Sequence, residues 1–436
     1  MLFDVPQKPD VSLYVSRQKS LCQAIQQELG GKESDQLLLF AGLEDERDDF
    51  RQESSFFYLT GIEEPGVVFC EQFDGKKTLY VPNFKIDRAK WMNVDVSFTQ
   101  ENAKQFGVDT VAHLGKEIFG YQACPFFTKD QYEYLLAQLK QVVDNGGKIF
   151  TLVPNDPCGY FHQRFILERL QTFLPELKNH IIDVSELVVR MRRKKDMQEF
   201  QCMYEAVAVT VMAQEAAAQA IAPDISEREV QGALEYIFTA SGARRAFSSI
   251  IAAGANATVL HASVSNDVLQ TGQLVIVDIG AEVGHYCADL TRTYPVSGKF
   301  TKRQRELYEA VLETQAYVES LAKPGMYLKN EKEQDKSLHH LAKNFLEAKG
   351  LEKYFTHGIG HFLGLDVHDV GDRGRPLQNG DMFTIEPGVY IPQEGIGIRI
   401  EDNYFIAKDE LMCLSEELPK DPDLIEKMMQ EKSPVE

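Results

Sequence analysis

Residues 274–295 of the chain read LVIVDIGAEVGHYCADLTRTYP. Two apolar runs flank the dipeptide Val283-Gly284, a pattern that is typical of a β-hairpin with a tight turn. Asp278 and Asp289 lie at equal distances from this turn, so we expect them directly opposite each other on adjacent strands. Side chains paired in this way point to the same face of the sheet, with Cβ atoms about 4.5–5.5 Å apart.

A second stretch, residues 382–407, reads MFTIEPGVYIPQEGIGIRIEDNYFIA and shows the same arrangement. Glu386 and Glu401 are symmetric about its turn, so we expect them to face each other as well. Like charges that face each other in apolar strands repel and destabilise the sheet. Two divalent cations among the four carboxylates would remove this repulsion, so the sequence predicts a dinuclear metal site.

Size and composition narrow the class of protein. A chain of 436 residues is long for one hydrophobic core, so we expect two domains. A net charge of −20 argues against nucleic acid or an anionic membrane surface as a partner. No apolar run reaches the length of a membrane span, and the N-terminus does not resemble a signal peptide. Seven scattered cysteines favour reduced thiols and a cytoplasmic location.

The first part of the chain combines strand-like and helix-like segments, so we expect an α/β domain. The expected elements are strands near 36–40, 66–70, 78–82 and 149–153 and helices near 130–143 and 162–173. We place the domain boundary between 175 and 190, with domains at 1–178 and 179–436. The basic cluster 190–195 is interpreted as a solvated or inter-domain salt-bridging surface.

The second part alternates long helices with pairs of strands, which predicts an α+β catalytic domain. Asp196 and Glu199 form a capping-box pattern that should begin its first helix. Helices are expected near 197–222, 226–241, 302–322 and 334–349, and strands near 246–252, 273–280, 286–295, 382–391 and 396–407. The charged, proline-punctuated tail from about residue 417 is expected to be partly mobile.

Histidines that could complete a metal site lie just before Glu386. His357 and His361 are spaced as in the zinc-binding helix HExxH, but the intervening glycines disfavour a helix and the glutamate is missing. We therefore expect a strand or turn whose backbone approaches a metal closely, with His368 following a few residues later. Oxygen-rich ligation favours a harder ion such as Mn²⁺.

A dinuclear site of this kind is suited to hydrolysis. Two ions about 3.5–4 Å apart can bridge a water, lower its pKa and polarise a carbonyl or phosphoryl oxygen. Spacing alone does not choose between an amide and a phosphate ester. The few cationic residues near the ligands, mainly Arg292 and Arg399, weakly favour an amide.

These residues resemble the motifs of the pita-bread metallopeptidases, the group that includes aminopeptidase P, prolidase and methionine aminopeptidase. The resemblance rests on VDIG at 277–280, ADLTRT at 288–293, HGIGHFLGLDVHD at 357–369, EPGVY at 386–390 and GIRIED at 397–402. The stretch 50–61, FRQESSFFYLTG, is similar to the signature of the aminopeptidase P N-terminal domain. The resemblance extends from about Tyr14 to Glu426 and implies an N-terminal α/β domain of the creatinase/aminopeptidase P type followed by a pita-bread catalytic domain.

The resemblance also implies roles for individual residues. Asp278 is expected to bind one ion, Asp289 and Glu401 to bridge both, and His361 and Glu386 to complete the other. Catalytic roles are implied for Glu386, as a proton shuttle, and for His261 and His368. Contacts with the substrate are implied for His261, His357, His368 and Arg399, and a polar network behind the metals for Tyr390 and Arg399. The segment after His261 departs from the common aromatic and Thr-Glu-Asn pattern, so we expect the pocket for the residue before proline to be wider or differently hydrogen-bonded in this chain.

The activity that the resemblance implies is that of an Xaa-Pro aminopeptidase. The resemblance implies that a metal-bridging hydroxide attacks the carbonyl before proline and that the cofactors are two divalent ions, with Mn²⁺ expected. It also implies a homodimer or homotetramer. Prolidase activity on Xaa-Pro dipeptides is the nearest alternative. A non-enzymatic peptide-binding relative and a metal-independent, creatinase-like hydrolase are further alternatives.

Overall fold

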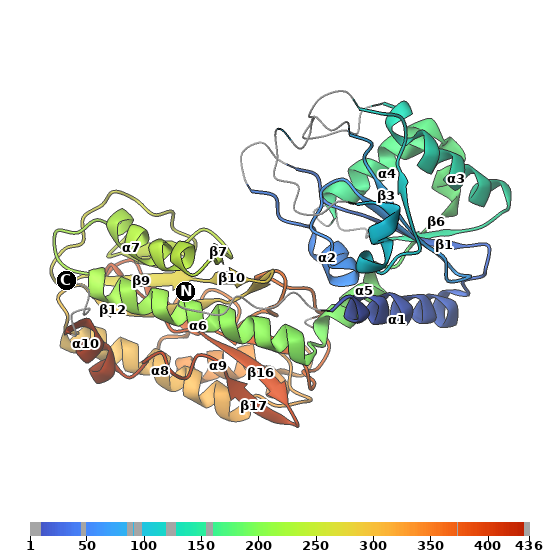
Figure 1. Cartoon of the computed structure of the whole chain (residues 1–436). Helices are drawn as coiled ribbons and strands as arrows, with labels where there is room; N and C mark the ends of the chain where they lie inside the picture. The colour runs from blue at the N-terminus through green and yellow to red at the C-terminus, as the bar shows by residue number, and fades with distance from the viewer. Residues whose placement is uncertain are drawn as a thin grey trace. The chain divides into compact units, whose positions relative to one another are not determined.

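The computed structural model describes residues 10–44, 49–84, 90, 98–118, 128–153, 160–372 and 374–430. The chain forms two compact units that divide between Arg192 and Arg193 (Figure 1). Within the described residues, no helix is both long and apolar enough to cross a lipid bilayer. The five cysteines that the structure describes are free thiols, and Cys124 and Cys158 lie outside the described residues.

The N-terminal unit is an α/β domain, as the sequence predicts. Its helices are α1 (Val11–Leu29), α2 (Ser54–Thr60), α3 (Glu133–Asp144), α4 (Phe161–Phe173) and α5 (Ser185–Arg193). Its strands are β1 (Gln36–Phe40), β2 (Val68–Gln72), β3 (Lys77–Val81), β4 (Thr110–His113), β5 (Ile149–Thr151) and β6 (Ile181–Asp183). They form one mixed sheet in the order β4-β3-β2-β1-β5-β6. Short 3₁₀ helices connect them at Gln100–Phe106, Asp130–Tyr132 and Pro175–His180.

Both faces of this sheet are covered, because β1 is buried along its whole length. Helices α3 and α4 pack on the face that carries Leu38 and Phe40. The stretch similar to the aminopeptidase P signature forms α2, where Glu53 caps the helix by accepting hydrogen bonds from the backbone of Ser55 and Phe56. Helix α2 ends at Gly61, where a Cβ would lie 2.3 Å from the ring of Tyr14, so only glycine fits.

The N-terminal unit extends beyond the boundary expected at 178. Strand β6 pairs with β5 in parallel and so belongs to the N-terminal sheet. Helix α5 follows it directly and was not expected from the sequence. A three-residue strand and a nine-residue helix rich in arginine are too short to produce a clear hydrophobic period.

The C-terminal unit contains the predicted long helices and strand pairs. Its helices are α6 (Met197–Ala220), α7 (Glu227–Ala240), α8 (Lys302–Leu321), α9 (Leu338–Ala348) and α10 (Pro422–Gln430). Its first strands are β7 (Arg244–Arg245), β8 (Ile250–Ala253), β9 (Leu274–Ile279), β10 (Ala281–Val283), β11 (Tyr286–Cys287) and β12 (Leu290–Pro295). The later strands are β13 (Met382–Ile385), β14 (Gly388–Ile391), β15 (Ile396–Arg399), β16 (Asp402–Ala407) and β17 (Glu410–Cys413). Short 3₁₀ helices lie at Asn256–Thr258, Gln334–Lys336 and Glu352–Tyr354.

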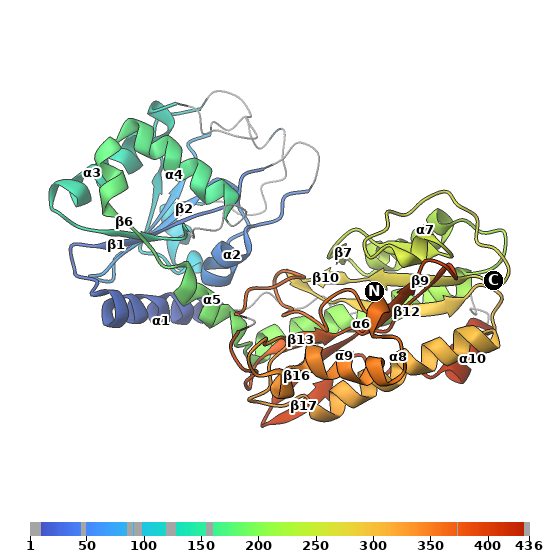
Figure 2. The same cartoon turned by 180° about the vertical axis from the view of Figure 1, so that it is seen from behind.

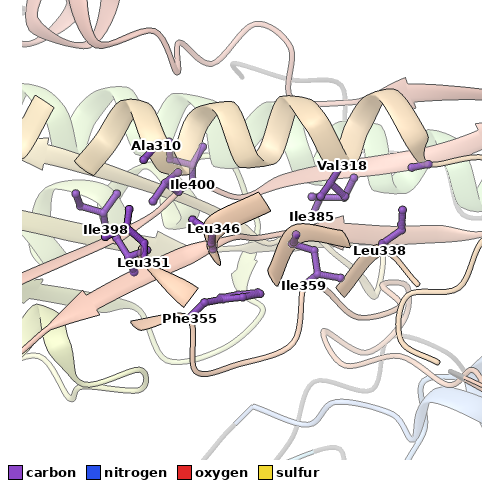
Figure 3. Close-up of a cluster of buried hydrophobic side chains, with 14 of the residues drawn as sticks. Ala310, Val318, Leu338, Leu346, Leu351, Phe355, Ile359, Ile385, Ile398 and Ile400 are labelled. Carbon is purple, nitrogen blue, oxygen red and sulfur yellow. The ribbon is translucent and has the colours of Figure 1, made fainter. Parts of the chain in front are cut away.

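Two hydrophobic cores hold these strands. Helices α6 and α7, green in Figure 1, pack with α10 against β8, β9 and β12. Helices α8 and α9, orange in Figure 2, pack against the strands from β13 to β16. Figure 3 shows Ala310 and Val318 of α8 directed toward Ile385 and Ile400, the residues next to Glu386 and Glu401. Because Ile385 and Ile400 are buried in this core, the backbone positions of Glu386 and Glu401 are fixed.

The prediction for the C-terminal tail was wrong in part. Residues 422–430 form α10, whose Ile425 and Met428 are buried in the core with α6. Apolar side chains spaced three apart allow even this charged segment to pack as an amphipathic helix.

The basic cluster 190–195 was expected to form a solvated or inter-domain salt-bridging surface, and the solvated alternative is wrong for most of its members. Arg190 forms an exposed ion pair with Glu28, but Arg192, Arg193 and Lys195 are buried. Arg193 pairs with Asp381 at 2.6 Å, and Lys195 with Asp369 at 2.7 Å. Arg193 and Lys195 can be buried because carboxylates within the same unit neutralise them, whereas Arg192 donates to the Ser55 hydroxyl.

Candidate active site

The first hairpin is one residue out of the predicted register at its turn. The turn residues are Gly284 and His285, both with positive φ (56° and 71°), and Asp278 is opposite Thr291. The prediction that Asp278 and Asp289 face each other directly is therefore wrong. Because side chains alternate along a strand, Asp289 still lies on the same face as Asp278, in a diagonal position.

The second hairpin has the predicted register. Strand pairs β13–β16 and β14–β15 share one alignment, which brings Glu386 level with Glu401. An isolated bridge between Thr291 and Glu401 joins the two hairpins. The Thr291 hydroxyl, two residues from Asp289, donates a hydrogen bond of 2.7 Å to Glu401 Oε2. The four carboxylates thus converge from two hairpins on one locus.

His361 lies among these carboxylates. Its Nε2 atom is 3.3 Å from Asp289 Oδ2, 3.6 Å from Glu386 Oε1 and 4.0 Å from Glu401 Oε1. Atoms of Asp289, His361 and Glu401 that could bind an ion all lie within 4.8 Å of one another. The His361 Nδ1 atom is 3.0 Å from the carbonyl oxygen of Phe362, so with the proton on Nδ1 the Nε2 lone pair is free to bind a metal.

The segment 357–361 has the non-helical conformation that its glycines predict. Residues Ile359 and His361 accept backbone hydrogen bonds from Glu386 and Thr384, so the segment runs beside β13. A Cβ at Gly360 would lie 2.0 Å from the carbonyl oxygen of Thr384, which leaves no room for a side chain. This close approach places His361 beside Glu386.

Three carboxylate oxygens of this cluster are buried without a hydrogen-bond partner: Asp278 Oδ1, Asp289 Oδ1 and Glu401 Oε1. A buried carboxylate oxygen that nothing neutralises is strongly destabilising. Burial raises the pKa of Asp289, and the charges of Asp278 and Glu386 raise it further. Burial likewise raises the pKa of Glu386 and of Glu401. The donor set of four carboxylates and one imidazole fits two divalent cations, which would supply the missing partners.

A second group of side chains lies behind Asp278. Arg399 donates to Asp278 Oδ2 at 2.6 Å and to the Tyr390 hydroxyl at 2.8 Å. His357 Nε2 is 2.9 Å from the same hydroxyl, and a Cβ at Gly388 would collide with it. Burial and the nearby Arg399 charge lower the pKa of His357 to about 4, so this imidazole is neutral at neutral pH. Burial raises the pKa of Tyr390 to about 12.

The four carboxylates, His361, His357 and Arg399 open into one cavity of about 780 Å³, and Tyr390 is buried behind them. The predicted site residues that line it are His261, Asp278, Asp289, His357, His361, His368, Glu386, Arg399 and Glu401. The rings of His361 and His368 lie 4.4 Å apart, edge to face, while His261 is exposed at the cavity wall. The sequence therefore identified a set of residues that the fold brings to one place.

Several residues around the cavity were not predicted. Thr291 could have been found, because the period of two places it on the same face as Asp289. Thr384, which accepts from the His361 backbone and donates to Glu386, could have been found in the same way. Arg228 and Arg245 also line the cavity, but they come from α7 and β7 and carry no sequence signal that points to it.

Comparison with known proteins gives two family matches. Residues 201–408 match metallopeptidase family M24, and residues 14–117 match the N-terminal domain of aminopeptidase P. An Xaa-Pro aminopeptidase from Haemophilus influenzae is 30% identical over 426 residues, which cover 90% of this chain and 93% of the relative. Xaa-Pro aminopeptidase 3 from Homo sapiens is 30% identical over 416 residues, 88% of this chain and 78% of the relative.

Two further similarities bear on the fold and on the nearest alternative activity. Aminopeptidase P from E. coli, solved with the inhibitor Pro-Leu, has a TM-score of 0.80 and 25% identity, covering 97% of this chain and 99% of that one. The predicted combination of an aminopeptidase P N-terminal domain with a pita-bread domain is confirmed. An Xaa-Pro dipeptidase from Pyrococcus horikoshii is 36% identical over 247 residues, 54% of this chain and 68% of the relative.

Proposed function

Because the chain belongs to the aminopeptidase P family within the M24 metallopeptidases, we propose that it releases the N-terminal residue from peptides that have proline in second position. It is a metal-dependent, proline-directed exopeptidase. The observation that best supports this function is that carboxylate oxygens buried without hydrogen-bond partners belong to residues that line the same cavity as His261, His357 and His368.

The residues that would hold two divalent ions are Asp278, Asp289, His361, Glu386 and Glu401. Mn²⁺ is the proposed ion, because the donor set is rich in carboxylate oxygens. When bound, such a pair of ions activates water and polarises the carbonyl group of the scissile amide. Arg399 supports the assignment of Asp278, because it neutralises one oxygen and leaves the other for an ion.

The chain's own residues then bind and orient the peptide. The free amine of the substrate is cationic and is attracted to the carboxylate cluster, which favours exopeptidase action. An Xaa-Pro bond has no N–H group and a fixed backbone angle, so it needs a shaped pocket rather than a hydrogen-bond acceptor. The cavity wall at His357, which the buried Tyr390 hydroxyl contacts from behind, is the proposed proline pocket. Neutral His357 suits this role, because it adds no charge beside an apolar ring.

Proton transfer is assigned to Glu386. It is the least buried of the four carboxylates, and its two oxygens face His361 Nε2 at 3.6 Å and His357 Nδ1 at 3.5 Å. A carboxyl whose pKa is raised by burial is suited to receive a proton from water and pass it to the leaving proline nitrogen. His368 and His261 are the proposed donors of hydrogen bonds to the scissile carbonyl oxygen.

The assay that tests this function measures release of the first residue from Ala-Pro-Leu and from Ala-Pro. We expect cleavage of the tripeptide in Mn²⁺, loss of activity on chelation, and recovery when Mn²⁺ is restored. Asp289→Asn should not recover. Cleavage of the dipeptide alone would favour prolidase activity, and full activity of Asp289→Asn would contradict the metal assignment.

We also propose that the protein forms a homo-oligomer and is located in the cytoplasm. A homodimer or homotetramer is expected from the family resemblance, and light scattering of the purified chain measures its mass directly. A cytoplasmic location accords with the five described cysteines, which are all free thiols.

A further inference from the structure

The active-site cavity has a second wall, which is separate from the proposed proline pocket. This wall is built by α7 and by the segment that joins β7 to β8. Ile250 of β8 lies directly opposite Asp278 of β9, and Arg245 of β7 lies opposite Ala281. The wall therefore runs beside the strand that carries Asp278. If the wall at His357 receives the proline ring, the wall of α7 and the β7–β8 segment is left to receive the residue before the scissile bond.

The base of this wall is apolar and its rim is cationic. Phe247, Leu260 and Val264 line the base, and Arg228 and Arg245 line the rim. An apolar base suits the aliphatic part of a side chain. The two guanidinium groups at the rim suit a carboxylate at the end of that side chain, because the arginine fork matches the geometry of two carboxylate oxygens.

The positive charge of the rim is only partly neutralised. Arg228 donates to Asn266 Oδ1 at 3.0 Å and to the carbonyl oxygen of Val264 at 3.3 Å, and within the described residues it forms no ion pair. Arg245 lies 3.8 Å from Glu235, and its side chain is 54% exposed. Glu235 also accepts hydrogen bonds from Gln231 and Ser249, so one carboxylate is shared among three donors. Two arginines and one glutamate leave an excess positive charge, although the chain carries a net charge of −20.

We propose that Arg228 and Arg245 select peptides whose first residue has an acidic side chain. The inference rests on the proposed function, since it assigns a substrate class to the same cavity. The carboxylate could also come from the C-terminus of a short peptide, so the test must separate these two sources. The geometry favours the side chain, because the arginines stand on the wall beside Asp278 rather than on the wall of the proline pocket.

The test compares four peptides on the Mn²⁺-loaded full chain. The peptides are Glu-Pro-Leu and Gln-Pro-Leu, each with a free or an amidated C-terminus, so they carry a carboxylate on the first side chain, at the C-terminus, at both places or at neither. We expect kcat/KM to be higher for the Glu peptides at low salt, because the guanidinium groups attract the side-chain carboxylate. The increase should be only about threefold to tenfold, because ion pairs of solvent-exposed groups are weak. The ratio should fall toward one in about 1 M KCl, where charges are screened within about 3 Å.

Variants locate the effect. In Arg228→Gln/Arg245→Gln the Glu-to-Gln ratio should fall to about one. Arg303→Gln is the matched control, because Arg303 is 49% exposed, pairs with Glu394 and does not line the cavity. It should retain the wild-type ratio.

Each remaining outcome overturns a defined claim. Equal rates on Glu and Gln peptides, or a ratio that the double variant retains, would overturn the acidic-substrate inference alone. A rate difference that follows the amidation of the C-terminus and disappears in the double variant would assign the arginines to the terminal carboxylate instead. Failure to cleave any of the four peptides would overturn the proposed function, and the inference with it.

Discussion

Replacing Lys195 with methionine should strongly destabilise the C-terminal unit. The Lys195 ammonium lies 2.7 Å from Asp369 Oδ2, and both side chains are only 1% exposed. The pair packs against Gly364, where a Cβ would lie 2.0 Å from Asp369 Oδ2 and 2.8 Å from Lys195 Nζ. Methionine fills a similar volume but removes the ammonium group that pairs with this buried carboxylate.

The expected cost follows from that burial. Removing one partner of a buried ion pair costs about 3–5 kcal/mol. In a unit of this size each kcal/mol lowers the melting temperature by about 2–4 °C, so Lys195→Met should melt about 6–20 °C lower. Asp369 directly follows His368, and its backbone N–H donates to Phe362. The same variant should therefore lower kcat by disturbing the loop between His361 and His368.

The control is the double variant Lys195→Met/Asp369→Leu. Two apolar side chains in place of a buried pair are often neutral or stabilising, so most of the melting temperature should return. Differential scanning calorimetry measures the melting temperatures of the wild type, the single variant and the double variant. A shift below about 2 °C in the single variant, or a double variant that melts no higher than the single one, would refute the reasoning.

Three further predictions concern residues of the C-terminal unit. Gly360→Ala should cost about 1–3 kcal/mol of unfolding free energy, because its Cβ would meet the Thr384 carbonyl, whereas Gly358→Ala, with no atom nearer than 3.8 Å, should cost far less in the same urea titration. Thr291→Val removes the hydrogen bond to Glu401 and should weaken Mn²⁺ binding about 10–100-fold, measured by calorimetric titration. Burial and the charge of Lys329 lower the pKa of His339 to about 4, below its unfolded value near 6.5, so the stability that neutral His339 provides is present above pH 6.5 and is lost as the pH falls toward 4. His339→Gln should flatten the dependence of melting temperature on pH over that range, and an unchanged slope would contradict this assignment.

The parts of the fold that follow from hydrophobic period were predictable. Strand β1 (Gln36–Phe40) has the predicted bounds, and the capping box of Asp196 and Glu199 begins α6 as expected. The long helices α6, α7 and α8 also lie where their apolar positions predict. Local chemistry fixes these elements, because the cap and the apolar face are both encoded within one segment.

What could not be predicted depends on tertiary contacts. The turn at Gly284 and His285 shifts the first hairpin by one residue, and His285 with positive φ gives no warning of this in the sequence. The burial of Arg193 and Lys195 depends on Asp381 and Asp369, which lie far along the chain. Arg228 and Arg245 reach the cavity only because α7 packs beside β8 and β7 pairs with β10. Side chains whose partners are distant in sequence carry no local pattern.

The error in register has little effect on the site, and the reason is geometric. A shift of one residue at the turn moves the partner of Asp278 by two positions along the opposite strand, from Asp289 to Thr291. A movement of two residues preserves the face to which a side chain points. Asp289 and Asp278 therefore remain on one face. Thr291 takes the position opposite Asp278, and its hydroxyl donates to Glu401. The shift replaces a direct repulsion between facing carboxylates with the hydrogen bond between Thr291 and Glu401, and it keeps Asp278 and Asp289 on the face that the proposed metal site requires.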